Sequence, residues 1–408
     1  MKSIQLLKQD IRIPLLLLRS FLSAFFPAMA FVTVYMMHNL GLSLAQVMTL
    51  QSVYMFSVAF FEVPTGIIGD KYSRKLSIII GAILYMLGWS IYLFKLKFIF
   101  YAFAEFLMGI AGALTSGSDS ALEYDIFKEN KLEKYYSRFV SMTRIAVLLA
   151  FISGGIFTAI FYSKLGLRGI WLISMFTTPL EILTLILIKE PKIHDSEQKL
   201  TPNYKWYIKQ MLNVIKSSKL LQLMIFLVLI FGQARYFANW AVQPLFLYFK
   251  IPVKYFGTIL LTVISTLGII VHSILIKYEK KIKITIKFTS IVLLSNILLF
   301  NIGILLAKLV HPSIIVFMII VFRLVAQEFG NLFQSLLHPF IPSKTRATVL
   351  SGVSLTKSLL FSITNPFIGY LMDIHLIKGS LALMFGLFLL GSFLYGNVIR
   401  LQEARNKT

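Results

Sequence analysis

The chain has 408 residues, of which 57% are hydrophobic and only 14% are charged, whereas a soluble globular domain carries roughly 25% charged residues. A soluble enzyme of this composition would expose far too much apolar surface to water, so lipid is its natural solvent. The net charge of +23 would suit nucleic acid, but the basic residues form short clusters between apolar runs instead of one basic face. The absence of cysteine excludes disulfides, thiolate metal sites and cysteine nucleophiles.

Long apolar segments recur along the whole chain. An α-helix needs roughly 20 apolar residues to cross the hydrocarbon core of a bilayer. Segment length and unbroken hydrophobicity favour helices over membrane strands, whose hydrophobicity alternates. The sequence therefore predicts an all-α polytopic membrane protein with twelve transmembrane helices. They are expected at 13–37, 47–69, 76–94, 97–120, 139–162, 169–188, 219–248, 255–276, 284–307, 312–337, 347–371 and 380–400.

The first apolar segment has some features of a secretory signal. It follows a basic N-terminus and contains Ala28-Met29-Ala30, which is typical of a cleavage site. The apolar run continues through Val34 and Met37, which makes it too long for the core of a signal peptide. We therefore interpret 13–37 as the first membrane helix.

The distribution of lysine and arginine sets the orientation of these helices. If both termini are cytoplasmic, the segments facing the cytoplasm carry 27 of these residues and the outer loops carry 8. Cytoplasmic loops of membrane proteins are enriched in positive charge. The sequence thus predicts a multi-pass protein of the bacterial plasma (inner) membrane with both termini in the cytoplasm.

A polar stretch at 189–218 divides the chain into two halves. We expect an N-terminal six-helix bundle at 1–188, a cytoplasmic central loop at 189–218 and a C-terminal six-helix bundle at 219–408. The halves are faintly repeated, because the basic run Lys71–Lys75 after the second helix recurs as Lys277–Lys281 after the eighth. Two pseudo-symmetric bundles follow from this reading.

The sharpest motif joins the second and third helices and reads Gly66-Ile67-Ile68-Gly69-Asp70-Lys71-Tyr72-Ser73-Arg74-Lys75. Glycines allow close helix approach, and a carboxylate at a helix end can face the positive end of another helix. The run resembles the loop signature of the major facilitator superfamily, with serine at position 73 where that family usually has glycine. The resemblance implies a gate that locks one access state. We assign to this gate Gly66, Gly69, Asp70, Arg74, Lys75, Asp119 and Asp125.

Other segments resemble one branch of bacterial members of this superfamily. They are Glu62-Val63-Pro64-Thr65-Gly66, Gly117 to Asp125, and Ser343 to Thr348. Two patterns of proton-coupled and drug-exporting members are absent. Glu105 stands where proton-coupled members often carry arginine, and Gly154-Gly155 lacks the neighbouring proline of drug antiporters.

Charged residues within membrane helices are costly, so they are functional candidates by default. The resemblance implies that helices 1, 4, 7 and 10 line a central cavity, and each of them carries charge here. Arg19 could also reach the lipid headgroups, and the other charges could form structural ion pairs. We expect Glu105 and Arg323 to face each other, and Glu105 or Glu328 to titrate during transport. The predicted cavity residues are Arg19, Glu105, Arg235, Asn239, Arg323, Gln327 and Glu328.

These features predict a secondary active transporter that works by alternating access, and not an enzyme. The resemblance implies proton-coupled export of a small amphipathic compound. Because the predicted cavity holds three arginines and two glutamates, ion-coupled or facilitated uptake of an anionic or zwitterionic solute is the alternative. The gating motif argues against a channel. We expect no cofactor, no metal and no nucleic acid; the expected partners are a small-molecule substrate, a coupling proton and the lipid bilayer, and we expect a monomer.

Overall fold

The computed structural model describes residues 3–71, 73–191, 213, 215–216, 218–278, 285–341 and 346–407. These ranges are helical almost throughout and contain no strand. The prediction of an all-α protein is therefore confirmed. Most of the polar stretch 189–218 lies outside the described residues.

The chain folds as two compact units. The first comprises Met1–Leu200 with Val253–Thr266, and the second comprises Thr201–Pro252 with Leu267–Thr408. The expected bundles 1–188 and 219–408 remain a prediction, and the short segment Val253–Thr266 packs with the first unit instead of the second.

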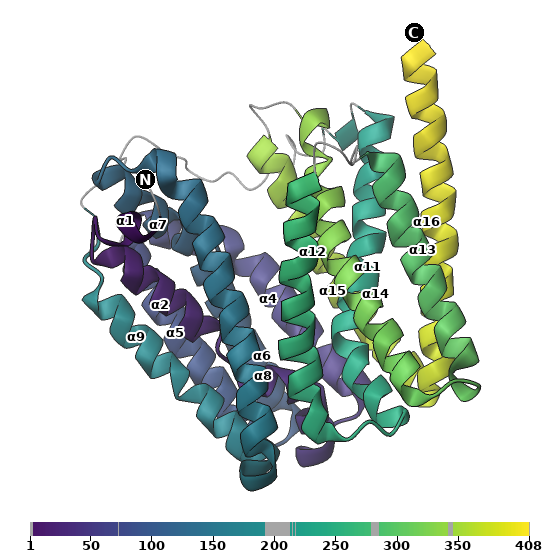
Figure 1. The fold of residues 1–408 in the computed structure, drawn as a ribbon, viewed down its shortest axis with the longest axis horizontal. Coiled ribbons are helices and arrows are strands. Elements are labelled where there is room, and N and C mark those ends of the chain that lie inside the picture. The colour runs from purple at the N-terminus through teal and green to yellow at the C-terminus, as the bar shows by residue number, and fades with distance from the viewer. Residues whose placement is uncertain are drawn as a thin grey trace. The chain divides into compact units, whose positions relative to one another are not determined.

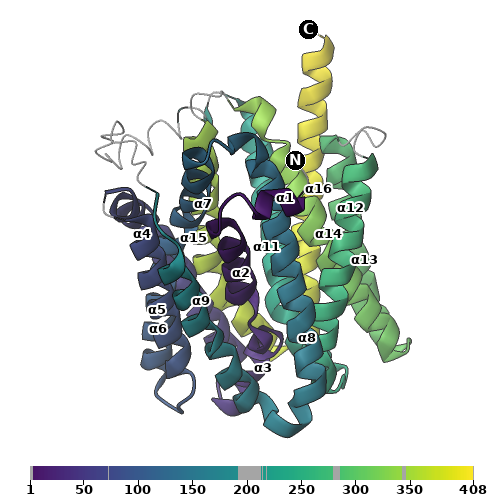
Figure 2. The ribbon, with the colours of Figure 1, turned by 60° about the vertical axis from the view of Figure 1, so that its left-hand side comes forward.

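In the first unit, α4 and α5 pack against α6, while α2 runs beside α8 and α9 (Figures 1 and 2). Its elements are α1 (Ser3–Leu7), α2 (Arg12–Ala24), the 3-10 helix η1 (Pro27–Phe31), α3 (Val32–Val34), the π-helix η2 (Tyr35–Asn39), α4 (Leu44–Lys71), α5 (Arg74–Ile91), α6 (Phe98–Ser116), α7 (Ser118–Glu129), η3 (Glu133–Tyr135), α8 (Tyr136–Met175), α9 (Thr177–Leu187), η4 (Val253–Tyr255) and η5 (Thr258–Val263).

In the second unit, α11 packs against α14 and α16, and α13 packs against the same two helices (Figure 1). Its elements are α11 (Lys219–Tyr248), most of α12 (Ile264–Tyr278), α13 (Ile286–Leu305), η6 (Leu306–Lys308), α14 (Pro312–Ser335), η7 (His338–Phe340), α15 (Arg346–Ile374) and α16 (Leu376–Lys407).

Ten stretches of the described chain are long and apolar enough to cross a membrane. One of them, Glu133–Leu187, has 55 residues and turns at Gly166, whose φ of 61° and ψ of −176° are not helical. It therefore contains two crossings. The 29-residue helix α15 is not among the ten but is long enough to cross, since a helix rises about 1.5 Å per residue. The described helices are thus compatible with the twelve that the sequence predicts.

The first membrane segment is not one regular helix. α2 ends at Ala24, and the chain resumes at Pro27 as a 3-10 helix and then a π-helix. Proline disfavours helical backbone at the residue before it, and Phe26 has a φ of −125° and a ψ of 78°. The break follows from the position of Pro27.

The fourth segment continues beyond its expected end at residue 120. α6 ends at Ser116, and α7 continues from Ser118 to Glu129 after Gly117. This extension carries Asp119 and Asp125, two of the three aspartates that were assigned to the gate.

Glycines bring α8 into close contact with residues 257–262 in the first unit. A side chain at Gly155 would overlap Thr262, and one at Gly257 would overlap Thr158. The hydroxyl of Thr262 donates a hydrogen bond to the carbonyl of Ile152 at 3.1 Å. Close packing of this segment against α8 explains why it belongs to the first unit.

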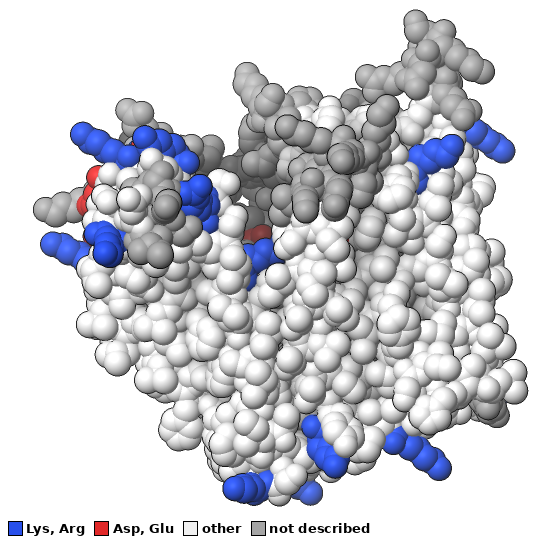
Figure 3. Space-filling model, in the orientation of Figure 1, with Lys and Arg blue, Asp and Glu red and all other residues white. Residues whose placement is uncertain are grey.

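Charged side chains lie mainly at the ends of each unit. On the face shown in Figure 3, Lys and Arg gather near two ends, and the surface between them is almost uncharged. Large apolar side chains are exposed along the helices, among them Phe103 at 53%, Ile363 at 75% and Phe393 at 68%. Apolar exposure of this extent suits lipid contact and not water.

Candidate functional site

The gating motif spans the end of α4 and the start of α5. Gly66, Gly69 and Asp70 lie in the last turns of α4, and their side chains lie outside the described residues. Ser73 is the N-cap of α5, because its hydroxyl accepts a hydrogen bond from the backbone N–H of Leu76 at 2.9 Å. Its φ of −168° is ordinary extended backbone, so the turn has no need of the glycine usual in the family.

Glu190, which follows α9, also caps the N-terminus of α5. Its Oε2 accepts a hydrogen bond from the Ser73 hydroxyl at 2.5 Å, and its Oε1 accepts one from the Arg74 backbone N–H at 2.8 Å. Negative charge is favourable at a helix N-terminus. The sequence analysis missed this contact, because no spacing pattern links residues 117 positions apart.

Lys75 forms the matching contact at the end of α9. Its Nζ donates to the carbonyl oxygens of Ile186 at 3.0 Å and Ile188 at 2.8 Å. These carbonyls form the negative end of that helix, where a cation is favoured. Together with Glu190, Lys75 ties the start of α5 to the end of α9.

Arg74 pairs with an acid on α7. Its Nη1 forms an ion pair with the carboxylate of Asp125 and donates to the carbonyl of Ala121 at 3.3 Å. The two side chains are mostly buried, at 21% and 14% exposure. This pair links α5 to α7, as the gate hypothesis requires.

Asp119 has a different partner from the one expected. The guanidinium of Arg19 lies 2.9 Å from Asp119 and 3.3 Å from Glu181 on α9. Six residues separate Asp119 from Asp125, which places them about 120° apart around a helix with 3.6 residues per turn. One aspartate therefore faces α5 and the other faces α2.

Arg19 is 5% exposed, so it does not extend to the lipid headgroups. It lies between two carboxylates inside the first unit. The sequence analysis named no partner for Glu181, and the structure gives it Arg19. The Arg19 cluster, formed by Arg19, Asp119 and Glu181, joins α2, α7 and α9.

Glu105 is a buried acid of the first unit with no ion pair among the described residues. It lies on α6 at 2% exposure. Its Oε1 accepts hydrogen bonds from the Tyr92 hydroxyl at 2.6 Å and from Gln51 Nε2 at 3.2 Å. Both partners are neutral, and no basic side chain among the described residues pairs with it. A buried carboxylate held only by neutral donors is suited to gain and lose a proton.

Aromatic rings fix the position of Tyr92 and hence of its bond to Glu105. Tyr92 stacks on Tyr101 with ring centroids 5.2 Å apart, and its carbonyl accepts a hydrogen bond from the Tyr35 hydroxyl at 3.0 Å. Tyr35 in turn stacks on Trp171 at 4.4 Å. The Glu105 site is thus supported by packed rings from four helical segments.

Three cations lie in the membrane helices of the second unit. Arg235 on α11 donates a hydrogen bond to Asn331 Oδ1 on α14 at 2.9 Å. Arg323 on α14 and Lys357 on α15 each lie close enough to Arg235 for electrostatic repulsion. Neither has a hydrogen-bond or ion-pair partner in the described part of the chain. Each charge placed at the centre of a membrane helix costs about 3 kcal/mol.

The acid in the middle of these helices, Glu328, is 6% exposed and lies 3.3 Å from His272 on α12. It also attracts Arg235 electrostatically. The predicted amides Asn239 and Gln327 are partly buried and have no hydrogen-bond partner within the described ranges. The face-to-face arrangement expected for Glu105 and Arg323 remains a prediction, because these residues belong to different units.

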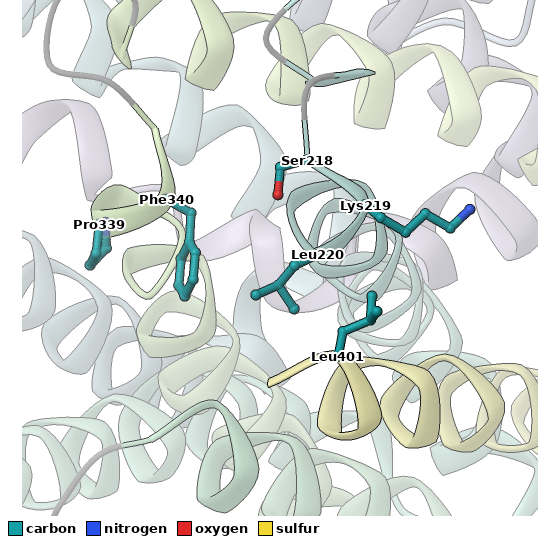
Figure 4. A pocket seen from close by; sticks show the side chains of 6 residues that line it. All are labelled: Ser218, Lys219, Leu220, Pro339, Phe340 and Leu401. Atoms are coloured by element: carbon teal, nitrogen blue, oxygen red, sulfur yellow. The ribbon is translucent and has the colours of Figure 1, made fainter. Parts of the chain in front are cut away.

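A pocket at the start of α11 holds none of the predicted residues. It is lined by Ser218, Lys219, Leu220, Pro339, Phe340 and Leu401 (Figure 4). No acid is among these lining residues, and both polar and apolar side chains contribute to them. Among the residues that the structure describes, no cluster of three or more His, Asp or Glu side chains could hold a metal ion.

Comparison with known proteins supplies the family. The model of the Major Facilitator Superfamily matches residues 15–361. No curated protein matches the chain. Several solved transporter structures share its fold at low sequence identity.

A mutant of the nucleoside transporter NupG aligns with a TM-score of 0.76 and 13% identity, over 96% of this chain and 99% of its own. A POT family transporter in complex with 5-aminolevulinic acid has a TM-score of 0.69 and 14% identity, over 95% and 96%. The peptide transporter POT in complex with sulfate has a TM-score of 0.72 and 14% identity, over 95% and 94%. The helical architecture and the family match agree: the chain belongs to the major facilitator superfamily, and is a multi-pass membrane transporter.

Proposed function

We propose that the chain is a secondary active transporter that moves a small solute by alternating access and couples this movement to protons. The observation that carries the proposal is Glu105, a buried carboxylate whose described partners are all neutral. An ionised carboxylate in this setting is costly, and protonation removes the cost.

Protonation would also change the hydrogen bonds around Glu105. The ionised carboxylate accepts from both Tyr92 and Gln51, whereas the protonated acid has an O–H of its own to donate. Both donors bond to Oε1, so a proton on Oε2 leaves these contacts in place and adds an O–H that needs an acceptor of its own. A new acceptor for this O–H is how proton binding would bias the helices α4, α5 and α6 toward one access state.

The ion pairs at the start of α5 and the end of α2 are the proposed gate. Arg74 with Asp125 and the Arg19 cluster hold α2, α5, α7 and α9 together. Their separation would accompany opening, and their re-formation would accompany closure. Positive-inside orientation assigns this gate to the cytoplasmic side.

The test is transport by the purified protein in proteoliposomes. A panel of amphipathic dyes and small organic anions would be screened for solute-driven proton movement with an entrapped pH indicator. We expect Glu105→Gln to reduce proton movement at least tenfold while solute exchange at equal pH continues. Glu133→Gln, at an exposed site in η3, is the matched control and should behave as the unaltered protein. Normal proton coupling in Glu105→Gln would refute the role of Glu105.

Direction and solute class are separate parts of the proposal. Export of an amphipathic compound is what the resemblance to the superfamily implies. Uptake of an anionic or zwitterionic solute is the second candidate, and the surplus of cations in the second unit favours it. Comparison of inside-out with right-side-out vesicles, each with an imposed proton gradient, separates export from uptake.

A further inference from the structure

The three cations of the second unit have too few acids to serve as their partners. Arg235, Arg323 and Lys357 lie on α11, α14 and α15. Within the described middle of these helices Glu328 is the one acid, and it already contacts His272. Asp373 lies near the far end of α15, 16 residues after Lys357, which is about 24 Å along a helix. A set of structural ion pairs would hold equal numbers of acids and bases, and this set does not.

Packing of α11 against α14 and α15 brings Arg235 near Lys357 and onto the face of α14 that carries Arg323. Arg235 bonds to Asn331, two turns beyond Arg323 on α14. The aliphatic part of the Lys357 side chain packs on Gly232: a Cβ added to this glycine would lie 3.3 Å from Cδ of the lysine. Gly232 is one turn before Arg235, so Lys357 and Arg235 approach from α15 and α11 respectively. Arg235 repels both Arg323 and Lys357 electrostatically.

The same region offers space and further donors. Arg323, Gln327 and Asn331 follow one another at intervals of four on a single face of α14. A Cβ added at Gly330 would meet no atom within 4 Å, and the side chain of Asn331 is exposed. The amides of Gln327 and Asn239 have N–H groups with no partner in the described chain.

We infer that Arg235, Arg323 and Lys357 form an oxyanion-binding site in the second unit, which holds a carboxylate or phosphate group of the transported solute. Guanidinium groups present paired N–H donors that match the two oxygens of a carboxylate or phosphate, and lysine adds a point charge. The bound anion supplies the missing negative charge and relieves the repulsion between the three cations. This inference rests on the proposed transport function and names its solute class.

Thermal unfolding of the purified full-length protein in detergent tests the site without any transport step. A ligand that binds only the folded state raises the unfolding temperature. Inorganic phosphate, sulfate and succinate would be titrated at constant ionic strength against chloride. We expect at least one oxyanion to raise the unfolding temperature with saturation, and the ranking of phosphate against succinate identifies the preferred group.

Variants then locate the binding. Arg323→Gln and Lys357→Gln should each raise the half-saturating oxyanion concentration at least tenfold. Arg400→Gln, at an exposed position on α16 of the same unit, should leave it unchanged. If Arg323→Gln does not fold, Lys357→Gln and the charge-preserving Arg235→Lys provide the comparison, and Arg235→Lys should weaken binding less than Lys357→Gln does.

Two outcomes would overturn the inference. One is the absence of saturable stabilisation by phosphate, sulfate and succinate alike. The other is an equal response in Lys357→Gln and Arg400→Gln, which would mark a general salt effect. Neither outcome bears on proton coupling at Glu105, which is measured separately in proteoliposomes, so failure of the anion site and failure of the transport proposal are distinguishable.

Discussion

Arg19 is the counter-charge of two carboxylates, although its position near the start of a membrane helix suggested contact with lipid headgroups. It is surrounded by Asp119 and Glu181, and both acids come from other helices. A buried ion pair adds modest stability by itself, but removal of one partner leaves the other uncompensated. The Arg19 cluster is therefore a structural requirement of the first unit, whatever its part in gating.

We predict that Arg19→Gln destabilises the protein by about 3–5 kcal/mol, because two carboxylates lose their cation in a buried setting. Chemical or thermal unfolding in detergent would measure the loss. Arg168→Gln removes an exposed arginine from the same unit and should change stability by less than about 0.5 kcal/mol. Equal stability of the two variants would show that Arg19 is not a buried counter-charge.

Which residues carry charge inside the membrane could be predicted from the sequence, but their partners could not. For Arg74 the sequence offered two acids at the end of the fourth membrane segment, Asp119 and Asp125, and the structure pairs it with Asp125. Asp119 was assigned to the same arginine, yet it faces Arg19. The choice depends on rotation around α7, and the break at Gly117 that sets this rotation has no clear signature in hydrophobicity.

Among the helices, the close contact between α8 and the segment 257–262 depends on the smallest side chains. At Gly155 an added Cβ would overlap Thr262 and approach the Gly257 carbonyl oxygen to 2.7 Å. Helices in membranes associate through such small residues, because burial of apolar surface gives no advantage over lipid. The glycine at position 155 of α8 is therefore explained by packing.

We predict that Gly155→Ala destabilises the protein by about 1–3 kcal/mol, as expected for an overpacked contact. Gly117→Ala is the matched control, since a Cβ there would meet nothing within 4 Å. Alanine at Gly117 should leave stability unchanged or raise it by up to about 1 kcal/mol, because alanine favours helix. Unfolding temperatures of the two variants decide the matter, and a stable Gly155→Ala variant would contradict the packing account.

Segment length alone predicts most of the membrane helices, because a run of apolar residues must reach across the bilayer. Segment length does not predict where the helical backbone within a segment is interrupted. Pro27 breaks the first segment, Gly117 divides the fourth, and Gly166 turns the chain between the two crossings of Glu133–Leu187. Of these three breaks, the one at Pro27 could have been predicted from the sequence, because proline disfavours helical backbone at the preceding residue.

At the scale of the whole molecule, orientation in the membrane follows from the asymmetry of basic residues and remains a prediction. The chain has no cysteine, so any single introduced cysteine is a unique label. We predict that Lys131→Cys and Lys287→Cys react only with reagents on the cytoplasmic side. Lys95→Cys and Lys254→Cys should react only from outside. All four lysines are exposed, and labelling of Lys131→Cys and Lys95→Cys from one side would contradict the predicted topology.

The family and the helical architecture were accessible from the sequence, because the signature after α4 and the apolar segments are local features. The partners of the charged residues in the two units could be predicted from the sequence only in part. Charge counts predicted an excess of cations, but the isolation of Glu105 from any cation depends on which side chains surround it. Such neighbourhoods arise from packing between helices far apart in the chain.

Glu190 lies just after the end of α9 and holds the start of α5. This residue immediately precedes Pro191 and the stretch that leads to α11, and its carboxylate is fastened to the hydroxyl of Ser73 and the amide of Arg74. The same short stretch of α5 that receives these two hydrogen bonds also carries the guanidinium that pairs with Asp125. Loss of the Glu190 carboxylate would therefore leave the N-terminus of α5 uncapped directly beside that ion pair.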